Sequence, residues 1–185
     1  MKNLLNIINT SKISNLGFLL IFILGGCHQS FQTAQTRNSL RHGGANQKVA
    51  NFIVEVNDYV LAVSTMSDLA EHKAQGKDTY LIAKELHERF DNLRTDLEFK
   101  STLKRVALPD ALSEDQDQHY QKVYAESEEK FDEAYQLKTE KGLEELKTLL
   151  VDQLENPIDE FTQDMSNHYL DEVRISIKKV SSLDS

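Results

Sequence analysis

Apolar residues recur every three or four positions over most of this chain, and this spacing constrains the fold more than any other feature. Such spacing places them along one face of an α-helix, which has to be buried against other helices. It predicts four long helices, over residues 47–75, 78–104, 128–155 and 157–182. No segment shows the sustained alternation that is typical of a strand. We therefore expect an all-α fold.

The lengths and connections of these segments indicate how the helices are arranged. At about 1.5 Å per residue, each helix spans roughly 40 Å, so the four match in length. Very short connections make the first two and the last two helices antiparallel hairpins. The middle connection, 105–127, is long enough to run the length of a bundle, as in the one-crossover ferritin-like arrangement. We predict a ferritin-like four-helix bundle with an extra short helix in this connection.

Two alternatives stay open for the middle connection. Its short helix either follows the length of the bundle or folds over one end as a lid, and residues 114–155 could form one helix instead of two. Local signals mark the helix ends. Ser113 and Gln116 form a capping box, Gly76 is suited to end the first helix in a left-handed conformation, and Asn156-Pro157 predicts the start of the last helix.

The beginning of the chain is typical of a secretory signal. Lys2 and Lys12 precede an apolar run of nine residues, 16–24, which leads to the small residues Gly25 and Gly26. A membrane-spanning helix needs about 20 apolar residues, so this run is short for one. An uncleaved anchor helix that extends back towards the start of the chain remains the alternative.

The four residues Leu24-Gly25-Gly26-Cys27 resemble the lipobox of bacterial lipoproteins. The resemblance implies cleavage between Gly26 and Cys27 and attachment of lipid to the Cys27 thiol, which would hold the protein at a membrane. Cys27 is the only cysteine, so lipidation also explains a lone thiol in an exported protein, with a free thiol as the alternative. His28 follows in place of the aspartate that resembles an inner-membrane retention signal. We expect a lipid-anchored protein of the bacterial cell envelope, at the outer membrane and facing the periplasm.

Residues 28–46 are rich in polar residues and glycine and show no apolar periodicity. They are interpreted as a flexible tether, which would reach roughly 25 Å. The predicted organisation is a signal peptide over 1–26, the lipidated cysteine with its tether over 27–46, and a helical domain over 47–182.

The charge balance narrows the possible partners. Cleavage would remove Lys2 and Lys12 and leave 19 of the 21 basic side chains against 30 acidic ones. Nucleic acids are bound by clustered Lys and Arg, and no such stripe is present, so we expect no nucleic-acid binding. The same sign argues against electrostatic attachment to anionic lipid headgroups, which leaves the lipid on Cys27 as the expected contact with the membrane.

The search for a catalytic or metal site gives no candidate residues. A di-iron site in a helical bundle needs Glu three residues before His, and none of the histidines at 72, 87, 119 and 168 has it. His168 with Asp171 and Glu172 forms at most a weak ligand set. The acidic residues between 110 and 117 are interpreted as a solvated helix start, where acids favour the helix dipole. We expect no catalytic residues, no metal and no cofactor.

Several segments resemble the domain of unknown function 4142 family, a set of exported ferritin-like helical proteins. They are Ser67-Asp68-Leu69-Ala70-Glu71 through Leu108-Pro109, Phe131-Asp132-Glu133-Ala134-Tyr135, and the helix after Pro157, so the resemblance covers about residues 47–180. Members often carry histidines on the second and third helices, where this chain has Phe90 and Leu143. The resemblance therefore implies a fold and an exported location, and it implies no activity.

Three functions are compatible with this sequence. The first is a non-catalytic interaction or envelope-maintenance protein that binds a protein partner through its helical surface. The alternative is a ferritin-like metal-binding or redox protein with an irregular site. A third is a bundle that holds a small apolar ligand.

Overall fold

The computed structural model describes residues 29–184, and these residues confirm the all-α prediction. The four long helices are α3 (Ala45–Lys73), α4 (Lys77–Lys104), α6 (Glu128–Glu155) and α7 (Glu160–Val180). Two short helices, α2 (Phe31–Arg41) and α5 (Glu114–Tyr124), and a final 3₁₀ turn, η1 (Ser181–Asp184), complete the described chain. No strand occurs between residues 29 and 184. None of the helices in this range is long and apolar enough to cross a membrane.

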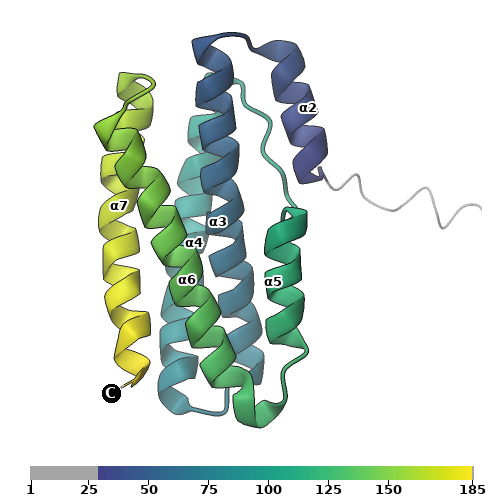
Figure 1. Ribbon diagram of the computed structural model, residues 1–185, viewed down its shortest axis with the longest axis vertical. Helices are drawn as coiled ribbons and strands as arrows, with labels where there is room; N and C mark the ends of the chain where they lie inside the picture. The colour runs from purple at the N-terminus through teal and green to yellow at the C-terminus, as the bar shows by residue number, and fades with distance from the viewer. Residues whose placement is uncertain (1–28, 185) are drawn as a thin grey trace, which may run out of the picture.

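The long helices lie side by side, with α3 packed against α4 and α6, and α7 packed against α6 and α4. In Figure 1 the chain runs down α3, up α4, up α6 and down α7, so each of the two predicted hairpins is antiparallel. The segment between α4 and α6 returns from one end of the molecule to the other, with α5 against α3 and α6. The alternative of a lid over one end is therefore wrong, as is the alternative of one helix over 114–155.

The core forms where the predicted apolar stripes meet. One cluster joins all four long helices around Ile53, Phe90, Leu143 and Val173, and a smaller cluster under α5 contains Phe131. Phe90 and Leu143, the positions where the resembled family often has histidine, are both fully buried in the larger cluster. These two positions therefore serve packing in this chain.

The prediction of a flexible tether over residues 27–46 is wrong for 31–41, which form helix α2 packed against α3. Ser30 caps α2 by accepting a hydrogen bond from Thr33 N at 3.2 Å. On the inner face of α2, Ala34 is fully buried. The Asn38 side-chain amide forms two hydrogen bonds with Ala107: its nitrogen donates to the Ala107 carbonyl oxygen at 2.9 Å, and its oxygen accepts from the Ala107 N–H at 2.7 Å. A helix held by a small residue and an amide lacks the apolar stripe that periodicity detects.

Two predicted helix boundaries also differ from the structure. Helix α7 begins at Glu160 and not at Pro157, because Asp159 and Thr162 form a capping box in which each side chain accepts from the other's backbone N–H. Gly76 precedes α4 with a φ of −80°, so it is not the left-handed end of α3. Its backbone N–H donates to Asp132 at 2.7 Å, and a Cβ at Gly76 would lie 2.8 Å from that carboxylate. A side chain at position 76 would therefore require the Asp132 carboxylate to shift.

The Ser113 cap is confirmed in part. Its hydroxyl accepts a hydrogen bond from Gln116 N at 3.3 Å, as the capping box predicts. The Ser113 backbone N–H, however, donates to Asp58 on α3 at 2.8 Å. Asp58 thus ties the start of α5 to the long helices, which a local sequence motif does not reveal.

Candidate functional site

The predicted lipidation residue, Cys27, and the residue before the predicted cut, Gly26, lie outside the described residues. The described part begins two residues later at Gln29, whose backbone oxygen accepts a hydrogen bond from Asp110 N at 3.1 Å. The Gln29 side chain also accepts from Arg37 at 2.7 Å. The described body therefore begins two residues after the predicted lipidation residue.

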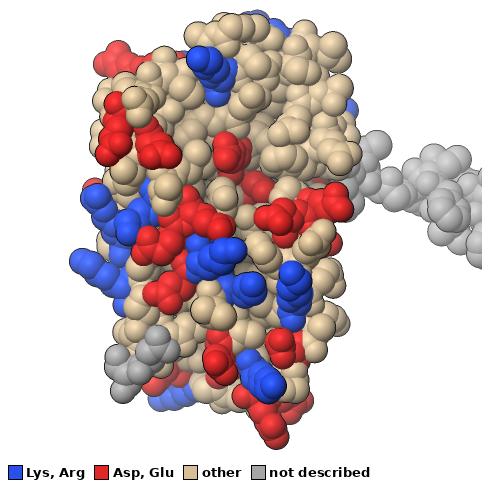
Figure 2. Space-filling model, in the orientation of Figure 1, with Lys and Arg blue, Asp and Glu red and all other residues tan. Residues whose placement is uncertain are grey.

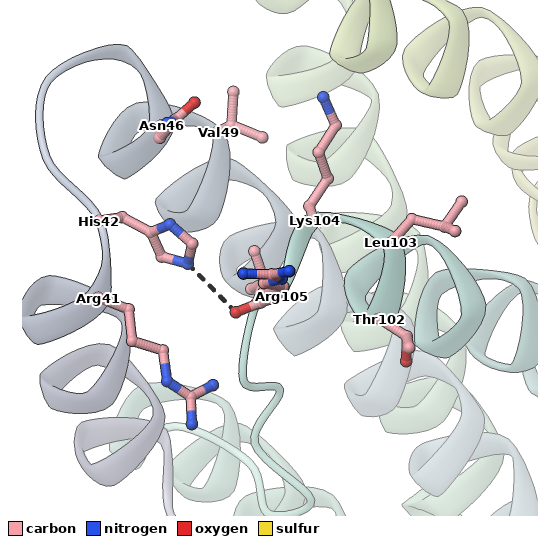
Figure 3. Close-up of a pocket in the computed structure, with 9 residues that line it drawn as sticks. Arg41, His42, Asn46, Val49, Thr102, Leu103, Lys104 and Arg105 are labelled. Atoms are coloured by element: carbon pink, nitrogen blue, oxygen red, sulfur yellow. Dashed lines mark hydrogen bonds between the residues drawn. The ribbon is translucent and has the colours of Figure 1, made fainter.

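A cavity of about 830 Å³ opens where the turn between α2 and α3 meets the end of α4. Residues from both sides of this junction line it: Arg41, His42, Asn46, Val49, Thr102, Leu103, Lys104, Arg105 and Val106. Figure 3 shows that Arg41 and His42 reach it from the end of α2, and that Lys104 and Arg105 come from the end of α4. We call this the basic cavity.

Two hydrogen-bonded helix ends shape the basic cavity. Helix α4 stops at Arg105, which adopts a left-handed conformation with a φ of 57°. This conformation lets Val106 N–H donate to Ser101 O at 2.8 Å, so a carbonyl left over at the helix end is satisfied. His42 follows α2, and its Nε2 donates to Arg105 O at 3.2 Å across the cavity (Figure 3). The two ends are thus joined to each other.

The charge of the basic cavity is opposite to that of the chain. No carboxylate lines it, and the first acidic residue of the sequence is Glu55, beyond the end of α2 and the first turns of α3. Lys104 pairs with Asp159 at 3.2 Å and lies over the Phe161 ring. Burial raises the pKa of Asp159, but the hydrogen bonds from Thr162 and Lys104 have the larger combined effect. The pKa of Asp159 is therefore lowered. Lys104 is therefore partly neutralised.

The two arginines of the basic cavity are not neutralised in this way. Neither Arg41 nor Arg105 forms an ion pair with any residue between 29 and 184. On the face shown in Figure 2, charged side chains crowd the middle and lower part, whereas the upper right, over α2 and the start of α3, is largely uncharged. This face of α2 therefore carries little charge of either sign.

A second polar cluster joins α3 to α4 around His87. Its Nδ1 donates to Glu71 at 2.6 Å, and its Nε2 lies 3.4 Å from Asp91, which accepts from Ser64 Oγ at 2.7 Å. Burial lowers the pKa of His87, but the Glu71 hydrogen bond and the charges of Asp91, Glu71 and Asp68 outweigh burial and raise it. The two ring nitrogens face different carboxylates, so the cluster is an ion-pair link between helices.

This link predicts that His87 stabilises the fold most at low pH. Its pKa is higher in the folded state than in the unfolded chain, so its contribution is complete below about pH 6.5 and is lost as the pH rises through the folded-state value. Urea unfolding of wild type and His87→Gln should therefore differ more at pH 5.5 than at pH 8.5. A difference that is independent of pH, or larger at pH 8.5, would contradict the assigned shift.

Two of the three residues of the His168, Asp171 and Glu172 set, the two acids on α7, form ion pairs with arginines. Glu172 bonds Arg89, which also pairs with Glu85 at 3.0 Å, and Asp171 lies 3.8 Å from Arg174. Among residues 29–184, no group of three or more His, Cys, Asp and Glu side chains has an arrangement that could hold a metal ion. The acidic residues of the 110–117 segment include the first turn of α5, as the dipole argument predicts.

Comparison with protein-family models, with curated proteins and with solved structures finds no match to this chain. The resemblance to the domain of unknown function 4142 family therefore stays a prediction from the quoted segments.

The basic cavity was not predicted from the sequence. Its charged residues, 41–42 and 104–105, lie about 60 positions apart in the chain, and only the docking of α2 brings them together. One signal was available, since the chain has no acidic residue before Glu55. A net charge calculated over the whole chain hides such a local excess of cations.

Proposed function

We propose that this protein is a lipid-anchored protein of the bacterial cell envelope, attached through Cys27 at the outer membrane and facing the periplasm. The lipobox-like segment 24–27 supports the attachment, and His28 supports the outer membrane. Each acyl chain contributes about 0.8 kcal/mol per buried CH₂, so two or more chains hold a protein durably at a bilayer.

The observation that carries the proposal is the position of Gln29. Its backbone and side chain are bonded to Asp110 and Arg37, so the body begins two residues after the expected lipidated cysteine. With lipid on Cys27, only two residues would separate the anchor from the bonded Gln29, so the body would lie beside the bilayer and not some 25 Å away on a tether. The short link also limits how the body can turn.

The surface around α2 suits a position beside a membrane. From residue 29 to 54 the chain carries Arg37, Arg41 and Lys48 and no acid, and Leu40 on the outer face of α2 is 83% exposed. Apolar side chains enter the headgroup region, and cations are attracted by anionic lipids. The acidic remainder of the body would then face away from the lipid.

For the body we propose a ferritin-like four-helix bundle that acts without catalysis and presents a helical surface to a protein partner. The return of the 105–127 segment along the long helices supports the one-crossover arrangement. The ion pairs His87–Glu71 and Arg89–Glu172 support a structural role for polar groups between helices. Stoichiometric iron, zinc or manganese in folded protein purified without chelator would contradict this proposal and favour the metal-binding alternative.

Cys27→Ser tests the anchor. We expect wild type to enter the outer-membrane fraction and to incorporate radiolabelled palmitate, and the variant to lose the label and leave that fraction. His28→Ser is the matched control, because it changes the next residue and keeps the thiol. Unchanged fractionation of Cys27→Ser, or no palmitate in wild type, would refute the proposed anchor.

A further inference from the structure

The basic cavity has the charge and shape of an anion site. Four basic residues line it, Arg41, His42, Lys104 and Arg105, in a chain with 30 acidic and 21 basic side chains. Its volume of about 830 Å³ lies within the range of roughly 300–1,000 Å³ that is typical of small-molecule sites. Lys104 is paired with Asp159, but Arg41 and Arg105 have no ion-pair partner among the described residues, so the lining keeps an excess of positive charge that favours an anionic occupant.

The two arginines supply most of the binding capacity. Arg41 and Arg105 form no ion pair with a described residue, so their guanidinium groups are available to a ligand. A guanidinium group presents a planar fork of N–H donors that matches the oxygens of phosphate or carboxylate. Two such forks from opposite walls suit a ligand with several oxygens and more than one negative charge.

The walls of the cavity are held in position before any ligand binds. The bond from His42 Nε2 to Arg105 O joins the two walls, and the Asn38 amide fixes α2 to Ala107 a short distance along the chain. Because a carbonyl oxygen only accepts, the His42 proton lies on Nε2. A site whose backbone is already fixed loses less conformational entropy when it binds its ligand.

Apolar residues complete the lining and indicate what the anion is attached to. Val49 and Val106 are buried at the cavity, and Leu103 at its edge is 62% exposed. A free inorganic ion would use only the polar part of this lining. A phosphoester, in which the phosphate carries an organic group, would contact both parts.

We propose that the basic cavity binds a phosphoester oxyanion, held by the Arg41 and Arg105 guanidinium groups with Lys104 and His42 beside them. The ligand is either the headgroup of an anionic phospholipid or a soluble phosphoester, since both present the same phosphate chemistry. The proposal uses only described residues and does not depend on lipid at Cys27.

The test compares two double variants of the full chain, purified in a neutral detergent. The cavity variant, Arg41→Gln with Arg105→Gln, lacks the two guanidinium groups. The matched control is Arg37→Gln with Arg94→Gln. The control also removes two arginines, one from α2 and one from α4, and neither Arg37 nor Arg94 lines the cavity. Thermal unfolding of both variants checks that they fold, which we expect because all four side chains lie at the surface of the molecule.

Glycerol phosphate and inorganic phosphate are titrated by calorimetry at constant ionic strength. We expect wild type and the control to bind glycerol phosphate alike, and the cavity variant to bind it at least about tenfold more weakly, since charge-assisted hydrogen bonds are lost. Inorganic phosphate should bind more weakly than glycerol phosphate because it lacks the apolar contact. No binding to wild type, or equal weakening in the control, would overturn the proposal.

The source of the phosphate is decided by repeating the glycerol phosphate titration in mixed micelles. If phosphatidylglycerol in the micelle weakens the binding of glycerol phosphate and phosphatidylcholine does not, the cavity takes the lipid headgroup. If neither lipid competes, the ligand is a soluble phosphoester. Both results are consistent with a phosphoester site in the basic cavity. They differ only in whether the ligand is a lipid headgroup or a soluble molecule.

Discussion

Phe90→Ala is expected to lower the free energy of unfolding by about 3–5 kcal/mol, the range for truncation of a fully buried phenylalanine. Phe90 has no exposed surface and lies in the cluster that joins all four long helices. The variant loses the transfer free energy of the ring and leaves a space that helices on both sides cannot easily fill. Urea unfolding followed by circular dichroism measures the loss.

Phe99→Ala is the matched control, because the same residue type on the same helix is 63% exposed there. We expect this variant to unfold within about 0.5 kcal/mol of wild type. Equal effects of the two substitutions would contradict the assigned face of α4, and a loss below about 1 kcal/mol at position 90 would contradict the packed core.

Asn38→Ala is expected to free helix α2 from the body. Its amide bonds both the N–H and the carbonyl of Ala107, and each buried backbone group left without a partner costs about 1–3 kcal/mol. We expect a global loss of about 2 kcal/mol, and a larger local effect on a helix of 11 residues that is too short to be stable alone. Hydrogen exchange of the α2 amides is the measurement.

Ser39→Ala provides the comparison, since Ser39 is the next residue of α2 and its side chain bonds only within the helix. Exchange in α2 should accelerate in Asn38→Ala and remain close to wild type in Ser39→Ala. If α2 exchanges rapidly in wild type itself, residues 31–41 behave as the tether predicted from composition, and the close anchor is refuted.

Periodicity predicted the long helices because burial of an apolar face is a repeated, local property of the sequence. The third long helix was predicted at 128–155 and is observed over Glu128–Glu155, and α4 starts one residue before its predicted beginning. The break between α5 and α6 was left open by the sequence, although the acids that follow Ser127 are typical of a helix start. These signals involve neighbouring residues only.

The errors occurred where contacts between distant residues decide the structure. Helix α2 depends on the pairing of Asn38 with Ala107, which are 69 positions apart. Gly76 donates its backbone N–H to Asp132 on α6, a contact that no local motif predicts. At α7 the mistake was local, because a complete capping box at Asp159 and Thr162 outweighed the proline signal.

The basic cavity shows the same limit for function. The excess of acidic residues predicted no electrostatic contact with anionic headgroups, but a net charge averages over the whole surface. The fold gathers Arg41 and Arg105, which form no ion pair with an acid between residues 29 and 184, at one junction. Only the arrangement of α2 against the end of α4 reveals this local reversal of charge.

The central claim is that lipid on Cys27 holds the body beside its membrane, and the intact mass of the protein purified from bacterial envelopes tests it most directly. We expect a chain that begins at Cys27 and carries the added mass of diacylglycerol and of a further acyl chain. A mass that corresponds to the full chain from Met1, or to a chain with an unmodified thiol at Cys27, would contradict the claim.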